Sequence, residues 1–371
     1  MIVGTVREIK DNEFRVGLTP EAAGELVHSG HTVLVEQGAG NGIGANDASY
    51  IDAGAEIVGA AADVFALAEM IVKVKEPQAA ERAMLRAGQI LFTYLHLAPD
   101  PVQAKELVRS GAVCIAYETV TADDGSLPLL KPMSQVAGRM AIQAGATALE
   151  KSHGGRGVLL GGVPGVLPAK VAIIGGGVVG FNAAQMAVGM GADVTILDRH
   201  APTLEKLGIH FEASAKTRFS NRANLAACVA DADLVIGAVL IPGAEAPKLV
   251  SRAMLATMKP GAVLVDVAID QGGCFETSHP TTHTDPTYVV DGIVHYCVAN
   301  MPGGVARTST YALGNVTLPH VLRLAKYGWQ EALRRDPHLM NGLNVAHGKV
   351  TCQPVADALD LPFTDPATVL V

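Results

Sequence analysis

Three strand-like segments of this chain each carry an ionisable residue near the carboxyl end. These residues are Lys75 in MIVKVKEP, His96 in ILFTYLHLA and Asp270 in AVLVDVAIDQGG. In an open α/β sheet, ligands bind beyond the carboxyl ends of the strands. A histidine titrates near neutral pH, which suits proton transfer. The coincidence of three such residues favours His96 as a catalytic acid/base over the alternative, a core histidine with a satisfied ring.

A glycine-rich turn carries the most specific local motif. The run from Gly175 to Gly180 matches GxGxxG, follows the strand VAII and opens the helix FNAAQMAVGM. In this pattern Gly175 permits the tight turn, Gly177 lets the backbone approach a pyrophosphate, and Gly180 lets the helix pack closely on the strand. The N-terminus of the helix supplies amide donors and a partial positive charge for the phosphates. The motif therefore predicts a dinucleotide site, with a ligand-free glycine turn as the alternative.

The acid that should bind the ribose of this dinucleotide is Asp198. It ends the strand DVTILD, about 20 residues beyond the glycine motif, as the dinucleotide pattern requires. A carboxylate at this position accepts hydrogen bonds from the ribose hydroxyls and repels a 2′-phosphate, so we expect NAD. The next residue, Arg199, is able to partner a 2′-phosphate and leaves NADP as an alternative.

A cation precedes all of these residues in the chain. Arg15 lies in DNEFRVGLTP, between the first predicted strand and the first predicted helix. A guanidinium can bind a carboxylate through two parallel hydrogen bonds, so Arg15 is a candidate for holding an acidic substrate. A plain surface arginine is the alternative.

The elements that position these residues alternate between apolar strands and amphipathic helices, which predicts parallel βαβ units. A helix over 19–30 should begin at the N-cap Thr19 with Pro20 in its first turn. Ser134 is the predicted N-cap of a helix over 135–151, and Pro319 is expected in the first turn of a helix over 317–333. Strands are predicted, among other places, at 2–6, 193–198, 233–240, 262–270 and 296–300.

The composition argues against several function classes. The 371 residues carry a net charge of -8, are 4% aromatic and contain no basic run, so no nucleic-acid partner is expected. No apolar run reaches the roughly 18 to 20 residues that span a bilayer, and charges at Arg7 and Glu8 rule out a signal peptide. The five scattered cysteines predict reduced thiols in the cytoplasm. No metal site is expected, because the pair in HPTTH lies in a predicted loop.

Taken together, the motifs resemble the alanine dehydrogenase family. The stretches that carry the resemblance include EIKDNEFRVGLTP, VKVKEP, LFTYLHLA, MSQVAGRMA, IGGGVVG, MKPGAVLVDVAIDQGG and VANMPGGVARTSTYALGNVTLP. They are spread over the whole chain, which makes the match more specific than any single glycine motif. The resemblance implies reversible, NAD-dependent oxidative deamination of L-alanine to pyruvate and ammonium. It also implies a homo-oligomer, usually a hexamer.

The same resemblance implies an α/β fold of two Rossmann-like, doubly wound domains with a cleft between them. The NAD-binding domain would be continuous over 129–306. The substrate domain would be discontinuous and built from 1–128 and 307–371.

Carried over position by position, the resemblance implies substrate binding and catalysis by the residues already singled out and two more. Substrate binding falls to Arg15, Lys75, Met133 and Asn300, and catalysis to His96 and Asp270. With the glycine motif, the expected cofactor contacts are Ser134, Gly175, Gly177, Val178, Gly180, Asp198, Ser220, Val239, Asp270 and Asn300. Gln135, Arg199 and Thr203 depart from the residues usual in the family and make the cofactor preference less secure than the fold.

Three other functions remain open on the sequence. A 2-hydroxyacid dehydrogenase would suit MKPGAVLVDVA and would not need ammonium. The nucleotide-binding subunit of a transhydrogenase should lack the full substrate set of Arg15, Lys75, His96 and Asp270. A non-enzymatic nucleotide-binding protein would bind NAD without turnover, because a fold does not determine a function.

Overall fold

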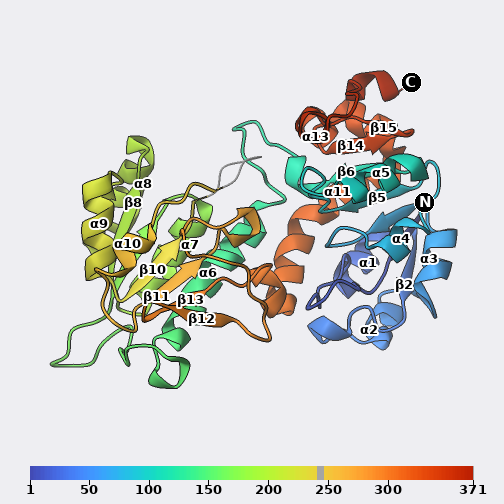
Figure 1. Cartoon of the computed structure of the whole chain (residues 1–371). Helices are drawn as coiled ribbons and strands as arrows, with labels where there is room; N and C mark the ends of the chain where they lie inside the picture. Colours follow the sequence, from blue (N-terminus) through green and yellow to red (C-terminus); the bar gives the residue numbers. More distant parts are fainter. Residues whose placement is uncertain (240–245, 371) are drawn as a thin grey trace. The chain divides into compact units, whose positions relative to one another are not determined.

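The computed structural model describes residues 1–239 and 246–370, which form two compact units (Figure 1). The first unit consists of Met1–Met133 and the chain from Gly303 onward, and the second is Ser134–Pro302. The chain leaves the first unit within helix α6 (Lys131–Ala148). The predicted fold of two Rossmann-like α/β domains is therefore confirmed. The domain boundaries at 128/129 and 306/307 stay predictions.

The first unit is built on one sheet whose central strands are parallel. Its strands are β1 (Ile2–Thr5), β2 (Thr32–Glu36), β3 (Glu56–Val58), β4 (Met70–Val72), β5 (Ile90–Thr93), β6 (Val113–Ala116), β14 (Leu343–Ala346) and β15 (Lys349–Val350). Their order in the sheet is β15-β14-β6-β5-β4-β1-β2-β3, with only β14 and β15 antiparallel to their neighbours. The chain winds outward in one direction from β1 and in the other from β4. The switch point, where such sheets bind ligands, thus lies between these two strands.

Helices connect these strands and complete the first unit. They are α1 (Pro20–His28), α2 (Asp47–Asp52), α3 (Ala61–Leu67), α4 (Ala79–Arg82), α5 (Pro101–Ser110), α11 (Ala306–Arg335), α12 (Pro337–Met340) and α13 (Gln353–Leu359). The predicted cap of α1 is confirmed, since Thr19 accepts a hydrogen bond from the amide of Ala22 and Pro20 is the first helical residue.

Helix α11 corrects a prediction. It begins at Ala306, so Pro319 lies inside the helix rather than in its first turn, and its axis is broken at Gly328. The turns before Pro319 bury Ser309, Thr310 and Leu313. This packing outweighs the loss of one helical hydrogen bond at the proline.

Among its described residues, the second unit contains a seven-stranded sheet. The order of the strands in this sheet is β12-β13-β11-β10-β7-β8-β9. The strands are β7 (Lys170–Ile174), β8 (Asp193–Asp198), β9 (Ala215–Phe219), β10 (Leu234–Gly237), β11 (Val263–Asp266), β12 (Thr287–Val290) and β13 (Ile293–Tyr296). All neighbours are parallel except β12 and β13. Strands such as β10 are buried along their whole length, as parallel strands covered on both faces must be. The switch point lies between β7 and β10.

The strand predicted at 296–300 is wrong in its position, because β13 ends at Tyr296. The cause is a hairpin with β12 that turns through Asp291 and Gly292. Both turn residues have positive φ angles, of 50° and 79°. Such two-residue turns favour Asp-Gly, so the dipeptide was the available signal.

The helices of the second unit include α6, α7 (Val178–Gly189), α8 (Ala201–Phe211), α9 (Arg222–Asp231) and α10 (Arg252–Leu255). Helix α6 begins at Lys131, so Ser134 lies in its first turn and the predicted N-cap there is wrong. Pro132 explains the earlier start, because proline fits the first turn of a helix. Helix α6 then packs tightly on α7, since a Cβ atom on Gly138 would lie 2.2 Å from the carbonyl oxygen of Val179.

Candidate active site

The switch point of the first unit gathers the predicted substrate residues. Lys75 follows β4 and His96 follows β5, which is its neighbour in the sheet. Hydrogen bonds join the chain at the carboxyl ends of these two strands: Tyr94 N donates to Val74 O at 3.2 Å, and Thr93 Oγ1 donates to Lys75 O at 2.9 Å. The structure therefore brings Lys75 and His96 to the same edge of the sheet. Both strands are shorter than predicted, and both residues lie beyond the strand ends.

Arg15 lies in the loop after β1 and is only 2% exposed. Its Nε and Nη2 atoms donate to the two carboxylate oxygens of Glu13, each at 2.6 Å, and its Nη1 atom lies 3.0 Å from Met133 Sδ. Burial opposes the charge of Arg15, but Glu13 outweighs burial and raises the pKa of the guanidinium. Arg15 is thus a fixed cation held in one orientation, not a mobile surface side chain. The contact also places Met133, a predicted substrate neighbour, beside it.

The backbone that carries Lys75 is held by a buried acid. Glu8 Oε1 accepts hydrogen bonds from Val74 N at 2.7 Å and from Lys75 N at 3.4 Å. The second oxygen of Glu8 accepts from Lys73 Nζ at 2.8 Å. The position of Lys75 therefore depends on a residue far away in the sequence.

Lys73 and Lys75 have separate roles although strand alternation places them on one face. Lys73 is completely buried and forms ion pairs with Glu8 at 2.8 Å and Glu81 at 2.7 Å. Burial disfavours the charge on Lys73, but the two carboxylates outweigh burial and raise the pKa of the ammonium. Lys75 is partly exposed. This makes Lys75 the lysine of the pair that solvent and ligands can reach.

His96 has a backbone conformation that L-residues rarely adopt, with a φ angle of 48°. Its side chain is 45% exposed and stacks on Tyr94 with ring centroids 5.7 Å apart and planes tilted by 7°. Tyr94 is itself anchored by a 2.7 Å hydrogen bond from its hydroxyl to Leu129 O. Strained conformations of this kind persist only where the surroundings enforce them, and they gather at functional sites.

The group that enforces the turn at His96 is Glu118, in the 3₁₀ helix η2 (Tyr117–Thr119) after β6. Glu118 Oε1 accepts a hydrogen bond from His96 N at 2.6 Å, and both of its oxygens accept from Leu95 N at 3.2 Å. The same carboxylate lies 3.9 Å from His96 Nδ1. Glu118 therefore holds the backbone of His96 and faces its ring with a negative charge.

The glycine motif lies at the switch point of the second unit. Gly175 directly follows β7, and a Cβ atom on it would lie 2.5 Å from Ala238 O at the end of the neighbouring strand β10. A Cβ atom on Gly180 would lie 1.8 Å from Gly175 O. Among residues 1–239 and 246–370, no atom from another part of the chain lies within 4 Å of the place a Cβ atom on Gly177 would take, and the next residue, Val178, is 38% exposed. The described residues thus leave the N-terminus of the twelve-residue helix α7 uncovered at Gly177, which fits a pyrophosphate.

Asp198 lies beside this turn, as the dinucleotide pattern predicts. Its Oδ2 atom accepts a hydrogen bond from Gly176 N at 2.7 Å, and its Oδ1 atom accepts from His200 N at 2.8 Å. Its carbonyl oxygen accepts from the amide of Ser220, a further predicted cofactor residue, at 2.8 Å. Val239 contacts the same turn, since its Cγ2 atom would lie 3.1 Å from a Cβ atom on Gly175. The structure therefore brings these predicted cofactor residues together.

Asp270 and Asn300 are also brought together within the second unit. Asp270 is exposed and lies in the 3₁₀ helix η5 (Ile269–Gln271), and its Oδ1 atom accepts a hydrogen bond from Asn300 N at 3.2 Å. Asn300 has a positive φ angle of 56°. Its carbonyl oxygen lies 3.2 Å from His283 Nε2. Ser134 lies in the first turn of α6 in the same unit and is partly exposed.

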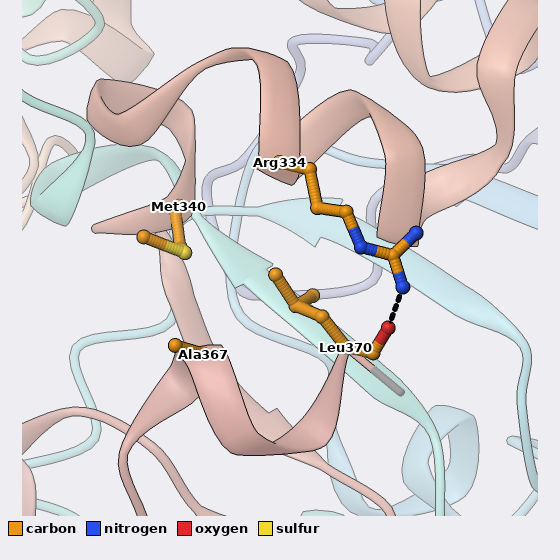
Figure 2. A pocket seen from close by; sticks show the side chains of 4 residues that line it. All are labelled: Arg334, Met340, Ala367 and Leu370. Carbon is orange, nitrogen blue, oxygen red and sulfur yellow. Dashed lines mark hydrogen bonds between the residues drawn. The ribbon is translucent and has the colours of Figure 1, made fainter.

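Two cavities in the part of the chain that the structure describes lie away from the predicted site residues. Figure 2 shows the first, of about 370 Å³, where the Arg334 guanidinium donates to the carbonyl of Leu370 beside Met340 and Ala367. The second, of about 360 Å³, is formed by β7, β8, β9 and α9. Neither cavity contains a predicted site residue among the residues that line it. Both are therefore set apart from the candidate active site.

Several supporting residues were missed in the sequence. Glu13, Glu118 and Glu8 contact predicted site residues, and only Glu13 is close in the sequence to its partner. The spacing of Glu13, two residues before Arg15, was a signal in the sequence that could have indicated their pairing. Nothing in the local sequence of Glu8 or Glu118 indicates their partners.

Comparison with known proteins shows the family to which this chain belongs. Residues 4–137 match the model of the N-terminal domain of the family described as alanine dehydrogenase/PNT, and residues 141–353 match the model of its C-terminal domain. The chain belongs to the alanine dehydrogenase/PNT family. A relative from Halomonas elongata named alanine dehydrogenase is 60% identical over 100% of both chains, and one from Bacillus subtilis is 56% identical over 98% of this chain and 96% of its own.

Solved structures give the same result. A structure of an L-alanine dehydrogenase is 51% identical, with a TM-score of 0.94 over 97% of this chain and 99% of the other. A transhydrogenase from Sinorhizobium meliloti is 27% identical with a TM-score of 0.82, over 95% of this chain and 99% of the other. Family membership and the prediction of an amino-acid dehydrogenase are thus confirmed, and the transhydrogenase alternative is not favoured.

Two further observations concern other kinds of site. Of the helices within residues 1–239 and 246–370, none is both long and apolar enough to cross a membrane. In the same part of the chain, histidine, cysteine and acidic side chains do not form a group of three that could hold a metal ion.

Proposed function

We propose that this enzyme catalyses the reversible, NAD-dependent oxidative deamination of L-alanine to pyruvate and ammonium. The observation that carries the proposal is the full-length identity of 60% to a protein named alanine dehydrogenase. The predicted substrate residues at one switch point and the dinucleotide motif at the other support it. The proposal assigns Arg15, Lys75 and His96 of the first unit to the substrate, and the dinucleotide motif of the second unit to the cofactor.

The substrate residues supply the charges that an amino acid or oxo acid requires. Arg15 carries a permanent positive charge and binds the substrate carboxylate in this proposal. Lys75 stabilises the carbonyl oxygen of pyruvate and the oxygen of the intermediate that forms when water adds. Met133 and Asn300 border the substrate. Arg15 is preorganised by Glu13, so little reorganisation accompanies binding.

The cofactor residues fit NAD by their chemistry. The open N-terminus of α7 suits the pyrophosphate, and Asp198 suits the ribose hydroxyls. We expect further contacts from Ser134, Val178, Ser220 and Val239. Bound NAD would supply the acceptor for the hydride of the substrate α-carbon, and the protein contributes orientation and charge.

Proton transfer is assigned to His96 and Asp270. After loss of the hydride, water adds to the iminium carbon of the substrate and the resulting carbinolamine releases ammonia, so protons must be removed and delivered. The imidazole of His96 can both accept and donate a proton, and its ring is accessible. Asp270 holds the amino group or orients the water.

The test of this proposal is NADH oxidation in the presence of pyruvate, with and without ammonium. Oxidation only when both are present supports amino-acid dehydrogenase chemistry. Oxidation with pyruvate alone would instead identify a 2-hydroxyacid dehydrogenase. NADH binding without any turnover, across small 2-oxo acids and with NADPH as well, would support a non-enzymatic nucleotide-binding protein.

A first prediction concerns the carboxylate that holds His96. We expect Glu118→Ala to lower kcat about tenfold, because His96 loses the acceptor that stabilises a left-handed backbone costing about 1–2 kcal/mol. Glu118→Gln keeps an acceptor oxygen for His96 N and should lose less. Glu106→Ala is a matched control, since Glu106 pairs with Arg82 elsewhere in the first unit. Unchanged kcat in Glu118→Ala would contradict the positioning role.

We also propose that the enzyme is a cytoplasmic homo-oligomer, a hexamer by its family resemblance. Exposed apolar side chains gather in one segment of the second unit, at Leu159, Val163, Val166 and Leu167, the last of them 86% exposed. Apolar side chains clustered in this way usually mark an interface. Light scattering should give a mass of several protomers, and a monomer at micromolar concentration would contradict the proposal.

A further inference from the structure

We infer that Asp266 is a positioning residue for Asp270, acting by closing the loop that carries it. Asp266 is the last residue of β11 and is completely buried. The inference rests on the proposed role of Asp270 in catalysis. It goes beyond that role because it explains how an exposed loop residue is held in place.

The carboxylate of Asp266 is bonded to both ends of the Asp270 loop. Its Oδ1 atom accepts a hydrogen bond from Ala268 N at 3.1 Å. Its Oδ2 atom accepts from Cys274 N at 2.9 Å and from Phe275 N at 3.2 Å. Residues on either side of 269–273 are therefore tied to one side chain, which fixes the span that the loop must cover.

The loop is shaped to approach this carboxylate. Gly272 and Gly273 have positive φ angles of 86° and 78°. A Cβ atom on Gly273 would lie 2.7 Å from Asp266 Oδ2, so a larger residue would push the loop away. On the β10 side, a Cβ atom on Gly237 would lie 2.3 Å from Cys274 Sγ. The far end of the loop is thus packed against the sheet as well as bonded to Asp266.

The charge of Asp266 makes this arrangement sensitive to a small change. Burial raises the pKa of the carboxyl group, while the hydrogen bonds it accepts, including one of 2.5 Å from Ser278 Oγ, favour the ionised form. An asparagine of the same shape has one acceptor oxygen and presents an NH₂ group to N–H or O–H donors. At least one end of the loop would then lose its partner.

The experiment is a double-mutant cycle of Asp266→Asn and Asp270→Asn, measured as kcat for NADH-dependent amination of pyruvate. We expect Asp266→Asn to lower kcat about tenfold in the parent enzyme, since small misplacements of reacting groups carry large rate penalties. In the Asp270→Asn background, Asp266→Asn should cause no further loss of kcat, because the effects of substitutions in residues that act as one unit are not additive. Equal losses in both backgrounds would overturn the inference.

Asp233→Asn controls for a general loss of stability. Asp233 is a buried carboxylate that precedes β10, and it accepts from Lys170 N at 2.8 Å and Arg156 Nη1 at 2.6 Å. This variant should lower Tm at least as much as Asp266→Asn while keeping kcat near that of the parent. A matching loss of kcat in Asp233→Asn would show that lost stability alone explains the effect.

Amide hydrogen exchange separates this inference from the proposed function. Asp266→Asn should speed the exchange of the Ala268, Cys274 and Phe275 amides relative to Asp233→Asn, whatever reaction the enzyme catalyses. Unchanged exchange would overturn the inference. Faster exchange with full activity in Asp270→Asn would support the loop closure and reject the catalytic role of Asp270.

Discussion

The His96→Ala variant is expected to lose about 10²- to 10⁴-fold in kcat, which is the contribution that a positioned general acid or base usually makes. The accessible ring of His96 follows β5, at the same edge of the sheet as Lys75, where the substrate is proposed to bind. The dinucleotide motif belongs to the second unit, so the affinity for NADH should stay close to that of the parent. Stopped-flow turnover and NADH fluorescence titration measure the two quantities separately.

His347→Ala is a close control for this variant. His347 is also an exposed histidine in the first unit, has a φ angle of 50°, and lies beside an aromatic ring, that of Trp329. It occupies the turn between β14 and β15, away from the switch point. Alanine at this position should leave kcat unchanged. Turnover near the parent rate in His96→Ala would refute the acid/base assignment.

The Asp198→Ala variant is expected to shift cofactor preference toward NADP by about 10²-fold in the ratio of kcat/KM values. NAD loses hydrogen bonds to a charged group, each contributing about 1.5–3 kcal/mol, and the repulsion of a 2′-phosphate disappears. The neighbouring Arg199 is exposed and becomes available to the phosphate. The ratio of kcat/KM values is measured because Asp198 also supports the glycine turn through Gly176 N. A general weakening of this turn should affect both cofactors alike and leave the ratio unchanged.

The control for cofactor preference lies on the same strand. Asp193 begins β8 and pairs with Lys216 at 2.6 Å, at the end of the strand opposite Asp198. Asp193→Ala should leave the ratio for NADP over NAD unchanged. If Asp198→Ala also left this ratio unchanged, Asp198 would not be the residue that recognises the ribose.

Local sequence was sufficient where one short segment contains the whole physical argument. The glycine motif predicted both the turn after β7 and the start of α7, because the tight turn and the close helix packing are properties of consecutive residues. The cap at Thr19 was predicted for the same reason. The alternation of apolar strands and helices also predicted parallel βαβ units, because a parallel connection requires a crossover.

Local sequence was insufficient where the partner of a residue is distant. Strand alternation placed Lys73 and Lys75 on one face and could not distinguish them. The fold buries Lys73 between Glu8 and Glu81 and leaves Lys75 accessible. The early start of α11 was missed for the same reason, since packing overrode the local signal of Pro319. The position of β13 was missed for a different reason, because the Asp-Gly turn that joins it to β12 was a local signal that was not used.

The sequence by itself determined which residues of this protein are candidates for the chemistry, and the tertiary structure decided how they are held. Arg15, His96 and Asp198 were found from residue type and spacing. The left-handed turn of His96 depends on Glu118, and the loop of Asp270 depends on Asp266. These carboxylates accept hydrogen bonds from backbone amides. Every residue except proline has such an amide, so the sequence does not indicate which side chain will accept from it. Only the folded chain brings the two together.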